Sequence, residues 1–173
     1  MCLGLGRFLV EASFNLKNMR KLIILILLIA IIACEKEEYL NEEEPVFTTM
    51  LDYVNYFRTH GATDCDGNYY PPVSKLEWDS KLELAAKYQS TYMNDTKEFS
   101  HTWKDGTELT DRLAKFGCDY TIAGENIAIS IGDAEAIRQW ICSSGHCENL
   151  MKAGFKYTAI VRVGNYWTQV LTN

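Results

Sequence analysis

The 173-residue sequence has little of what marks several common classes of protein. It holds three prolines and 11 glycines, too few for a collagen-like or low-complexity chain. Its 17 Lys and Arg form no basic stripe and are outnumbered by 23 Asp and Glu, so nucleic-acid binding is not expected. HExxH, P-loop, dinucleotide-binding and GxSxG motifs are all missing, which removes the usual signatures of zinc proteases, nucleotide-binding enzymes and α/β-hydrolases. The 47% of hydrophobic residues suffices for the core of one globular domain.

An apolar segment near the N-terminus has the layout of an export signal. Residues 22–33 (LIILILLIAIIA) directly follow Arg20 and Lys21, and the run ends at the small residue Ala33. As a helix rising ~1.5 Å per residue the run would reach about 18 Å, whereas a bilayer core is ~30 Å thick. The segment is therefore too short to span a membrane. We expect Met19 to be the true start and residues 1–18 to be an upstream extension.

The end of this run, Ile31-Ile32-Ala33-Cys34, resembles the lipobox of bacterial lipoproteins. The resemblance implies cleavage before Cys34 and diacylation of its thiol, and hence an exported protein anchored at the outer membrane or cell surface. A plain signal peptide and a short anchor helix are the alternatives. The chain then divides into a signal segment (1–33), a tether (34–46) and a domain (47–173).

The tether and the domain together are strongly acidic. Residues 1–33 contain four of the 17 Lys and Arg and one of the 23 Asp and Glu, so the chain from Cys34 onward has a net charge of −9. Electrostatics would not attract such a chain to an anionic membrane, so the lipid on Cys34 would have to hold it there. Lys36-Glu37-Glu38 also resembles a signal that sends some Gram-negative lipoproteins to the outer surface, and a solvated linker is the alternative.

The domain shows helical periodicity first and strand patterns later. Apolar residues at helical spacing, with capping residues before them and glycines after them, predict four helices and a short helix or turn. These begin near Phe47 (capped by Thr48 or Thr49 and ended by Gly61), after the cap Asp79, at Leu109 (ended by Gly117), after the cap Asp133 and at Cys147. Strands are expected at 127–131, 156–163 and 166–171, the last two joined by the turn Gly164-Asn165. This order predicts an α+β domain whose helices cover an antiparallel sheet.

Two histidines and one glutamate are the candidates for a functional site. His60 follows a helix in a polar turn and is expected to be exposed. His101 and His146 each lie at a helix-to-loop junction beside small residues, and Glu125 lies in a polar turn before a strand. Such a set is able to bind a divalent metal or a polar ligand. Hydrogen bonding that only anchors the loops is the alternative.

A series of short motifs runs in a fixed order through residues 47–173. Asn55 and Arg58 lie in the first helix. The others are Leu76-Glu77-Trp78-Asp79 with Ala85-Ala86, Phe99-Ser100-His101, Asp105-Gly106, Asp111-Arg112-Leu113, Phe116-Gly117, Gly124-Glu125-Asn126-Ile127-Ala128, Trp140, Ser144-Gly145-His146 with Asn149-Leu150-Met151, and Tyr166-Trp167-Thr168-Gln169-Val170. Together they resemble the CAP superfamily, also called the SCP/PR-1 domain, in its bacterial secreted form. Each motif alone is weak, whereas the ordered set is specific.

The resemblance implies an α-β-α sandwich with a shallow, open cleft lined by two histidines and two acidic residues. Carried over to this sequence, the histidines are His101 and His146, and one acid is Glu125. Many eukaryotic members have a Glu eleven residues after the first histidine, where this chain has Arg112. We take the adjacent Asp111 as the second acid; Glu108, one helical turn earlier, is the other carboxylate nearby.

Two classes of function follow from the resemblance. The first is a non-catalytic module at the cell envelope that binds a small lipid or sterol, a cell-wall fragment or a protein. The second is a metal-dependent hydrolase, in which His101 and His146 hold Zn²⁺ or another divalent metal and Glu125 orients an imidazole or acts as a base. We favour the first class and expect no organic cofactor.

The domain contains four cysteines, an even number typical of disulfides in an exported protein. Three pairings are possible, and Cys142 and Cys147 are close enough in sequence to pair locally. Bacterial relatives with a Gly-His-Cys motif often carry a partner cysteine after the first helix, a place that Cys65 matches. The resemblance therefore implies a Cys65–Cys147 disulfide and leaves Cys118 to pair with Cys142.

Overall fold

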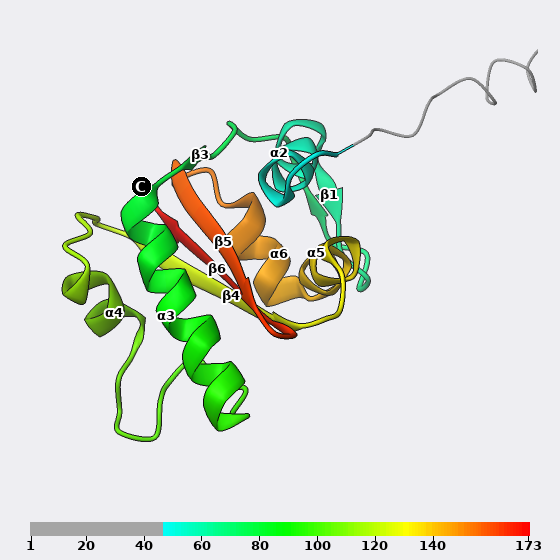
Figure 1. Cartoon of the computed structure of the whole chain (residues 1–173). Coiled ribbons are helices and arrows are strands. Elements are labelled where there is room, and N and C mark those ends of the chain that lie inside the picture. The colour runs from blue at the N-terminus through cyan, green and yellow to red at the C-terminus, as the bar shows by residue number, and fades with distance from the viewer. Residues whose placement is uncertain (1–46) are drawn as a thin grey trace, which may run out of the picture. The chain divides into compact units, whose positions relative to one another are not determined.

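The computed structural model describes residues 47–173, which contain a four-stranded sheet in the order β3-β5-β6-β4 (Figure 1). The predictions for the signal segment, Cys34 and the tether lie outside the described residues. Strands β5 (Tyr157–Val163) and β6 (Tyr166–Thr172) form the predicted antiparallel hairpin. Its turn residue Gly164 has a φ of 58°, and a Cβ at this position would collide with the Asn94 side chain, so the turn requires glycine.

The two outer strands make the sheet mixed rather than purely antiparallel. Strand β4 (Ala123–Ile129) pairs antiparallel with β6, which confirms the expected third strand with an earlier start. The two-residue strand β3 (Glu77–Trp78) pairs parallel with β5, and it corrects the prediction of an all-antiparallel sheet. Two exposed residues are too few to show an alternating pattern, so no strand was predicted at this position.

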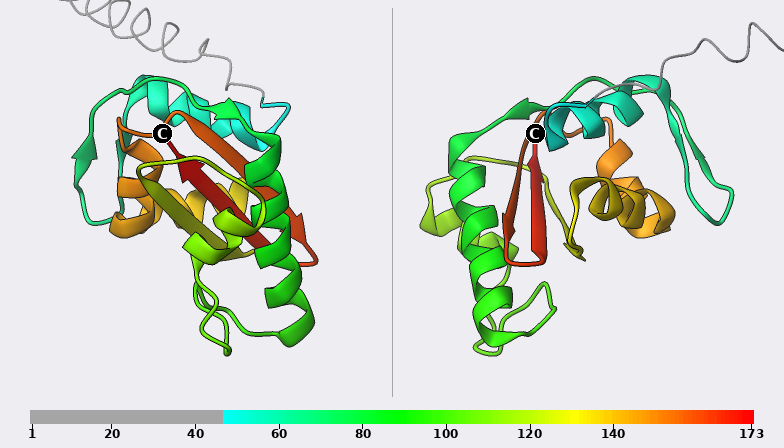
Figure 2. Two further views of the ribbon diagram at one scale, coloured as in Figure 1. Left: turned by 90° about the vertical axis from the view of Figure 1, so that its left-hand side faces the viewer. Right: turned by 45° about the vertical axis from the view of Figure 1, so that its right-hand side comes forward.

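Helices cover both faces of the sheet and produce the expected α-β-α layers (Figure 2). Helices α3 (Ser80–Thr96) and α4 (Leu109–Lys115) pack on one face. Helices α2 (Met50–His60), α5 (Asp133–Cys142) and α6 (Ser144–Met151) pack on the other. No helix among residues 47–173 is both long enough and apolar enough to cross a bilayer.

Each face of the sheet has its own apolar core. Val170 and Leu171 are consecutive in β6 and both fully buried, one in each core, because successive strand side chains point to opposite faces. The core beneath α3 and α4 contains Leu82, Ala85, Ala86, Leu113, Ala159 and Val170. The larger core beneath α2, α5 and α6 includes Val54, Ile137, Trp140, Cys147, Leu150, Phe155, Trp167 and Leu171.

Capping residues fix where the helices begin. Thr49 accepts a hydrogen bond from the Asp52 amide at the start of α2, and Asp79 accepts from the amides of Lys81 and Leu82 at the start of α3, as predicted. The prediction for α5 was wrong by one residue. Gly132 is the N-cap and Asp133 is the first helical residue.

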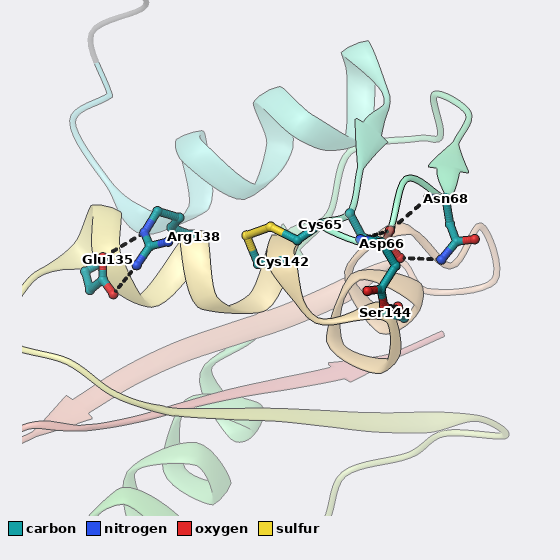
Figure 3. The surroundings of a disulfide bond; sticks show 8 residues. Cys65, Asp66, Asn68, Glu135, Arg138, Cys142 and Ser144 are labelled. Carbon is teal, nitrogen blue, oxygen red and sulfur yellow. Dashed lines mark hydrogen bonds and ion pairs between the residues drawn. A yellow bond between two sulfur atoms is a disulfide. The ribbon is translucent and has the colours of Figure 1, made fainter.

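The loop expected at 63–74 contains a short hairpin that is hydrogen-bonded to the start of helix α6. Strands β1 (Ala62–Thr63) and β2 (Tyr69–Tyr70) flank a turn in which Asp64 accepts hydrogen bonds from the amides of Asp66 and Asn68. Hydrogen bonds, led by one from the Asn68 side chain, lower the pKa of Asp64 to about 2. Asp66 also accepts from the Ser144 hydroxyl at 2.7 Å, which joins the hairpin to the start of α6 (Figure 3).

The disulfide pairing differs from the expected one. Cys65 is bonded to Cys142 at the end of α5, with an S–S distance of 2.07 Å (Figure 3). Neither Cys118 nor Cys147 is bonded to another described cysteine. Cys147 is fully buried in the larger core, whereas Cys142 lies at the end of its helix beside the hairpin that carries Cys65. The expected Cys65–Cys147 and Cys118–Cys142 bonds are therefore not formed.

Buried polar side chains of α2 attach this helix to distant loops. Arg58 is fully buried and donates to the backbone oxygens of Ser74, Leu150 and Phe155. Burial lowers the pKa of its guanidinium to about 10. Asn55 both donates to the carbonyl of Leu76 and accepts from its amide, as a neighbouring strand would. These two residues of the first motif therefore have structural roles.

Candidate functional site

Glu125 lies at the centre of the site, with both carboxylate oxygens hydrogen-bonded. Its side chain projects from β4 and is 3% exposed. Oε1 lies 2.8 Å from Nδ1 of His101, and Oε2 accepts from a terminal nitrogen of Arg112 at 2.7 Å. A carboxylate in a buried ion pair with arginine remains ionised. Since it then only accepts hydrogen bonds, Nδ1 of His101 must be the donor.

Arg112 is the residue of this site that the sequence reasoning did not assign. Its side chain is completely buried, and it also donates to the backbone oxygen of His101 at 3.1 Å. Its Nε is buried and has no hydrogen-bond partner among the described residues. Charged side chains are usually exposed, so an arginine beside Leu113 gave no signal of burial.

The loop that carries His101 connects α3 to α4 and is held in place by Gln89 of α3. This fully buried side chain donates to the backbone oxygen of Ser100 at 2.7 Å and accepts from the indole of Trp103. The Trp103 ring also stacks on Tyr92, with centroids 4.1 Å apart. The loop is therefore anchored on both sides of His101, whose own side chain is 52% exposed.

The first turn of helix α6 brings His146 to the same strand. Asn126, the neighbour of Glu125, donates to the backbone oxygen of His146 at 3.2 Å and to Gln169 at 3.0 Å. The side chain of Asn149 in α6 donates to the side-chain oxygen Oδ1 of Asn126, which fixes the orientation of the Asn126 side-chain amide. Burial, and next the charge of His101, lower the pKa of His146. The surroundings of His146 therefore favour its neutral imidazole.

A pocket of about 400 Å³ opens beside His101. Its lining consists of His101, Thr102, Glu108, Leu109 and Glu125. Of the four predicted residues, His101 and Glu125 are hydrogen-bonded to each other and line this pocket, whereas His146 is attached to the same strand through its backbone oxygen.

The predicted second acid, Asp111, has a different role. Its carboxylate accepts a hydrogen bond from the backbone amide of Glu108 at 2.9 Å and so caps helix α4. Glu108 lines the pocket instead. Helix α4 begins at Leu109, between the two candidates. Glu108 is therefore the carboxylate that takes the place expected for the second acid in the pocket.

The donor set does not fit a metal centre built from three protein ligands. Among residues 47–173, no three His, Cys, Asp or Glu side chains form a group able to hold a metal ion. Both oxygens of Glu125 are already engaged by His101 and Arg112. Cys147 follows His146 but is fully buried, and burial raises the pKa of its thiol to about 11, so it is not a thiolate ligand or nucleophile at neutral pH.

A second, apolar pocket lies away from the histidines. It measures about 460 Å³ and is lined by Thr49, Met50, Leu51, Trp78 and Ile160. None of these side chains can transfer a proton near neutral pH, so this pocket offers apolar contact rather than chemistry.

Comparisons with known proteins agree on the family. The sequence profile of the cysteine-rich secretory protein family, CAP, matches residues 51–171. The chain is 34% identical over 122 residues to the uncharacterized membrane protein YlbC of Bacillus subtilis, a match covering 69% of this chain and 32% of that one. It is 32% identical over 100 residues to YkwD of the same organism, covering 56% and 39% of the two chains. The chain therefore spans about a third of the first relative and about two fifths of the second.

Solved structures share the fold. An extracellular protein of Bacillus anthracis containing an SCP domain superposes with a TM-score of 0.63 at 24% identity, over 76% of this chain and 45% of that one. An outer surface protein of Borrelia burgdorferi gives a TM-score of 0.61 at 18% identity, over 72% and 89%. These structures share the fold, and the profile match over residues 51–171 establishes that the chain belongs to the CAP, or cysteine-rich secretory protein, family.

Proposed function

We propose that this protein is an exported, lipid-anchored CAP domain that binds a ligand at the cell envelope through the His101 pocket. The observation that carries the proposal is the fixed carboxylate of Glu125, which holds His101 at the rim of an open pocket while Arg112 holds its other oxygen. Such a group forms part of a rigid binding wall.

The location at the envelope is supported by the sequence and by the names of similar proteins. The stretch Ile31-Ile32-Ala33-Cys34 has the order expected of a lipoprotein cleavage site. Similar proteins are described as a membrane protein, an extracellular protein and an outer surface protein. Cys34→Ser should release the protein from the membrane fraction into the soluble fraction. A wild-type protein that is already soluble would favour a plain signal peptide.

The lining of the pocket favours binding of a polar ligand, and Glu125 itself is not a free base. A general base must accept a proton from the substrate, but both oxygens of Glu125 already accept from protein donors. Thr102 and Glu108 add polar groups to the pocket, and Leu109 adds one apolar wall. This lining suits a polar ligand such as a cell-wall fragment better than a sterol or a fatty acid, which would fit the apolar pocket at Trp78.

Calorimetry with three variants tests this assignment. A soluble peptidoglycan fragment should bind the wild type and lose at least about tenfold in affinity in His101→Ala, a change of about 1.4 kcal/mol. Trp78→Ala and His60→Ala should bind it normally, because Trp78 lines the other pocket and His60 lies at the exposed end of α2. Binding of fatty acid that is lost only in Trp78→Ala would move the function to the apolar pocket.

The metal-dependent hydrolase is the second candidate. The bond from Nδ1 of His101 to Glu125 leaves Nε2 as the free ring nitrogen, the arrangement in which carboxylates orient metal-binding histidines. Titration with Zn²⁺ decides between the candidates. Tight binding by the wild type that is lost in His101→Ala, together with turnover of a peptide, would favour the hydrolase.

A further inference from the structure

We infer that Arg112 is a positioning residue that fixes the tautomer of His101, so that the pocket presents the lone pair of Nε2 to a ligand. Arg112 stands where many eukaryotic members of the family have an acid, and it does not line the pocket itself. It acts through Glu125, whose second oxygen it binds at 2.7 Å, and through the backbone oxygen of His101.

The tautomer follows from which groups can donate. Arginine carries donors only, so Oε2 of Glu125 must accept from Arg112. The positive charge beside it keeps the buried carboxylate ionised. Oε1 therefore has no proton to give, and Nδ1 of His101 must donate to it. A neutral imidazole with its proton on Nδ1 has its lone pair on Nε2.

Without the charge of Arg112 the proton would move. Glu125 is 3% exposed, and an isolated carboxylate at such a position favours taking a proton. If the proton stays on Glu125, its hydroxyl donates to Nδ1 and the imidazole proton resides on Nε2. If the proton passes to His101, both ring nitrogens carry hydrogen. In either state Nε2 changes from an acceptor into a donor.

Burial of Arg112 leaves one of its donors without a partner, and the proposed positioning role explains why the residue is buried nevertheless. Its Nε has no acceptor among the described residues, whereas one terminal nitrogen donates to Glu125 and the other to the backbone oxygen of His101. A buried donor without a partner destabilises a fold and calls for an explanation beyond packing. The bonds to the site supply that explanation.

The inference also narrows the class of ligand, and this step rests on the proposed function. With Nε2 of His101 as an acceptor, and with Glu108 among the residues that line the same pocket, the pocket offers mainly acceptors. The ligand should therefore present hydrogen-bond donors, such as the hydroxyl groups of a sugar or an ammonium group. A ligand that offers only acceptors would place them against the acceptor atoms of His101 and Glu108 and would bind poorly.

Long-range ¹H–¹⁵N spectra of the histidine rings, recorded at pH 8 without ligand, test the tautomer. Comparison with His101→Ala assigns the His101 signals. The wild type and the charge-keeping control Arg112→Lys should carry the proton on Nδ1 and none on Nε2. Arg112→Met should carry a proton on Nε2. The inference is overturned if wild-type Nε2 is protonated, or if Arg112→Met keeps the wild-type tautomer.

Glu125→Gln provides a second test in case Arg112→Met does not fold. Arg112 can bond only the amide oxygen, so the amide NH₂ must face His101 and Nδ1 must accept. The proton should then reside on Nε2, and a proton remaining on Nδ1 would contradict the inference. Because these spectra are recorded without ligand, a wrong tautomer prediction would not contradict the proposed binding function. Equally, absence of fragment binding alongside the expected tautomers would refute only the proposed function.

Discussion

Glu125 and Asn126, consecutive residues of β4, attach two distant histidines to one strand. Glu125 bonds the ring of His101, and Asn126 donates to the backbone oxygen of His146. Their side chains point to opposite faces of the sheet because strand side chains alternate. Strand β4 is at the edge of the sheet, where the loop before α4 and the start of α6 both reach it. One dipeptide thus organises segments from both helical layers.

Replacing the central carboxylate should destabilise the domain strongly. Glu125→Ala leaves the buried charge of Arg112 unpaired, which typically costs about 3–5 kcal/mol of unfolding free energy. Urea unfolding followed by circular dichroism measures the loss. Glu135→Ala is the matched control, since its ion pair with Arg138 is exposed and its loss should change stability little. Similar losses in both variants would show that Arg112 does not depend on Glu125.

The disulfide between Cys65 and Cys142 should be the main covalent support of the β1–β2 hairpin. It joins residues 77 positions apart, and loss of a loop closure of that length should lower the unfolding free energy by about 4 kcal/mol in Cys65→Ser. Cys118→Ser, which removes a thiol without a disulfide partner among the described cysteines, is the control. Peptide mapping under non-reducing conditions should recover a Cys65–Cys142 peptide. A Cys65–Cys147 peptide would instead restore the pairing implied by the family resemblance.

The two remaining thiols of the domain should differ in reactivity. Burial raises the pKa of both, to about 11 for the fully buried Cys147, while Cys118 is partly exposed. Iodoacetamide at pH 8 should therefore alkylate Cys118 first and reach Cys147 only on unfolding. Mass spectrometry of timed samples measures the order, and early labelling of Cys147 would contradict its burial.

Cys147 should also make stability depend on alkaline pH. Its pKa in the folded state, about 11, exceeds the ordinary value of 9.0, so the folded state holds the proton more tightly. This stabilisation is complete below pH 9 and is lost as the pH rises from 9 to 11. Thermal unfolding of Cys147→Ala should show a smaller loss over this interval than the wild type. Equal losses would assign the effect to other groups.

The sequence alone predicts the parts of this fold that depend on local chemistry. Gly164-Asn165 specifies a tight turn, and Asp79 has the side chain that a helix start needs, so both predictions are confirmed. The strand at Glu77 was missed because its pairing with Tyr157 depends on the folded sheet rather than on any local pattern. The pairing of Cys65 likewise depends on which cysteine lies beside the hairpin in three dimensions.

The site shows the same division. His101, Glu125 and His146 were identifiable because their motifs occur in the family's order, and the first two form a direct hydrogen bond. Asp111 and Glu108 are one helical turn apart, and only the position of the helix start shows that the first caps α4 and the second faces the pocket. Arg112 was recognised as a departure from the family pattern, but its burial and its bond to Glu125 have no counterpart in the sequence.

The convergence of the two imidazoles is tested most directly by the pKa of His146, measured by NMR in the presence of a chelator. Burial lowers this pKa first, and the positive charge that a protonated His101 carries lowers it further. His101→Phe retains a ring of similar bulk but removes the charge, so the pKa of His146 should rise towards 6.5. His60→Phe, which changes a histidine at the exposed end of α2, should leave it unchanged. An unchanged pKa of His146 in His101→Phe would show that the two histidines do not share a site.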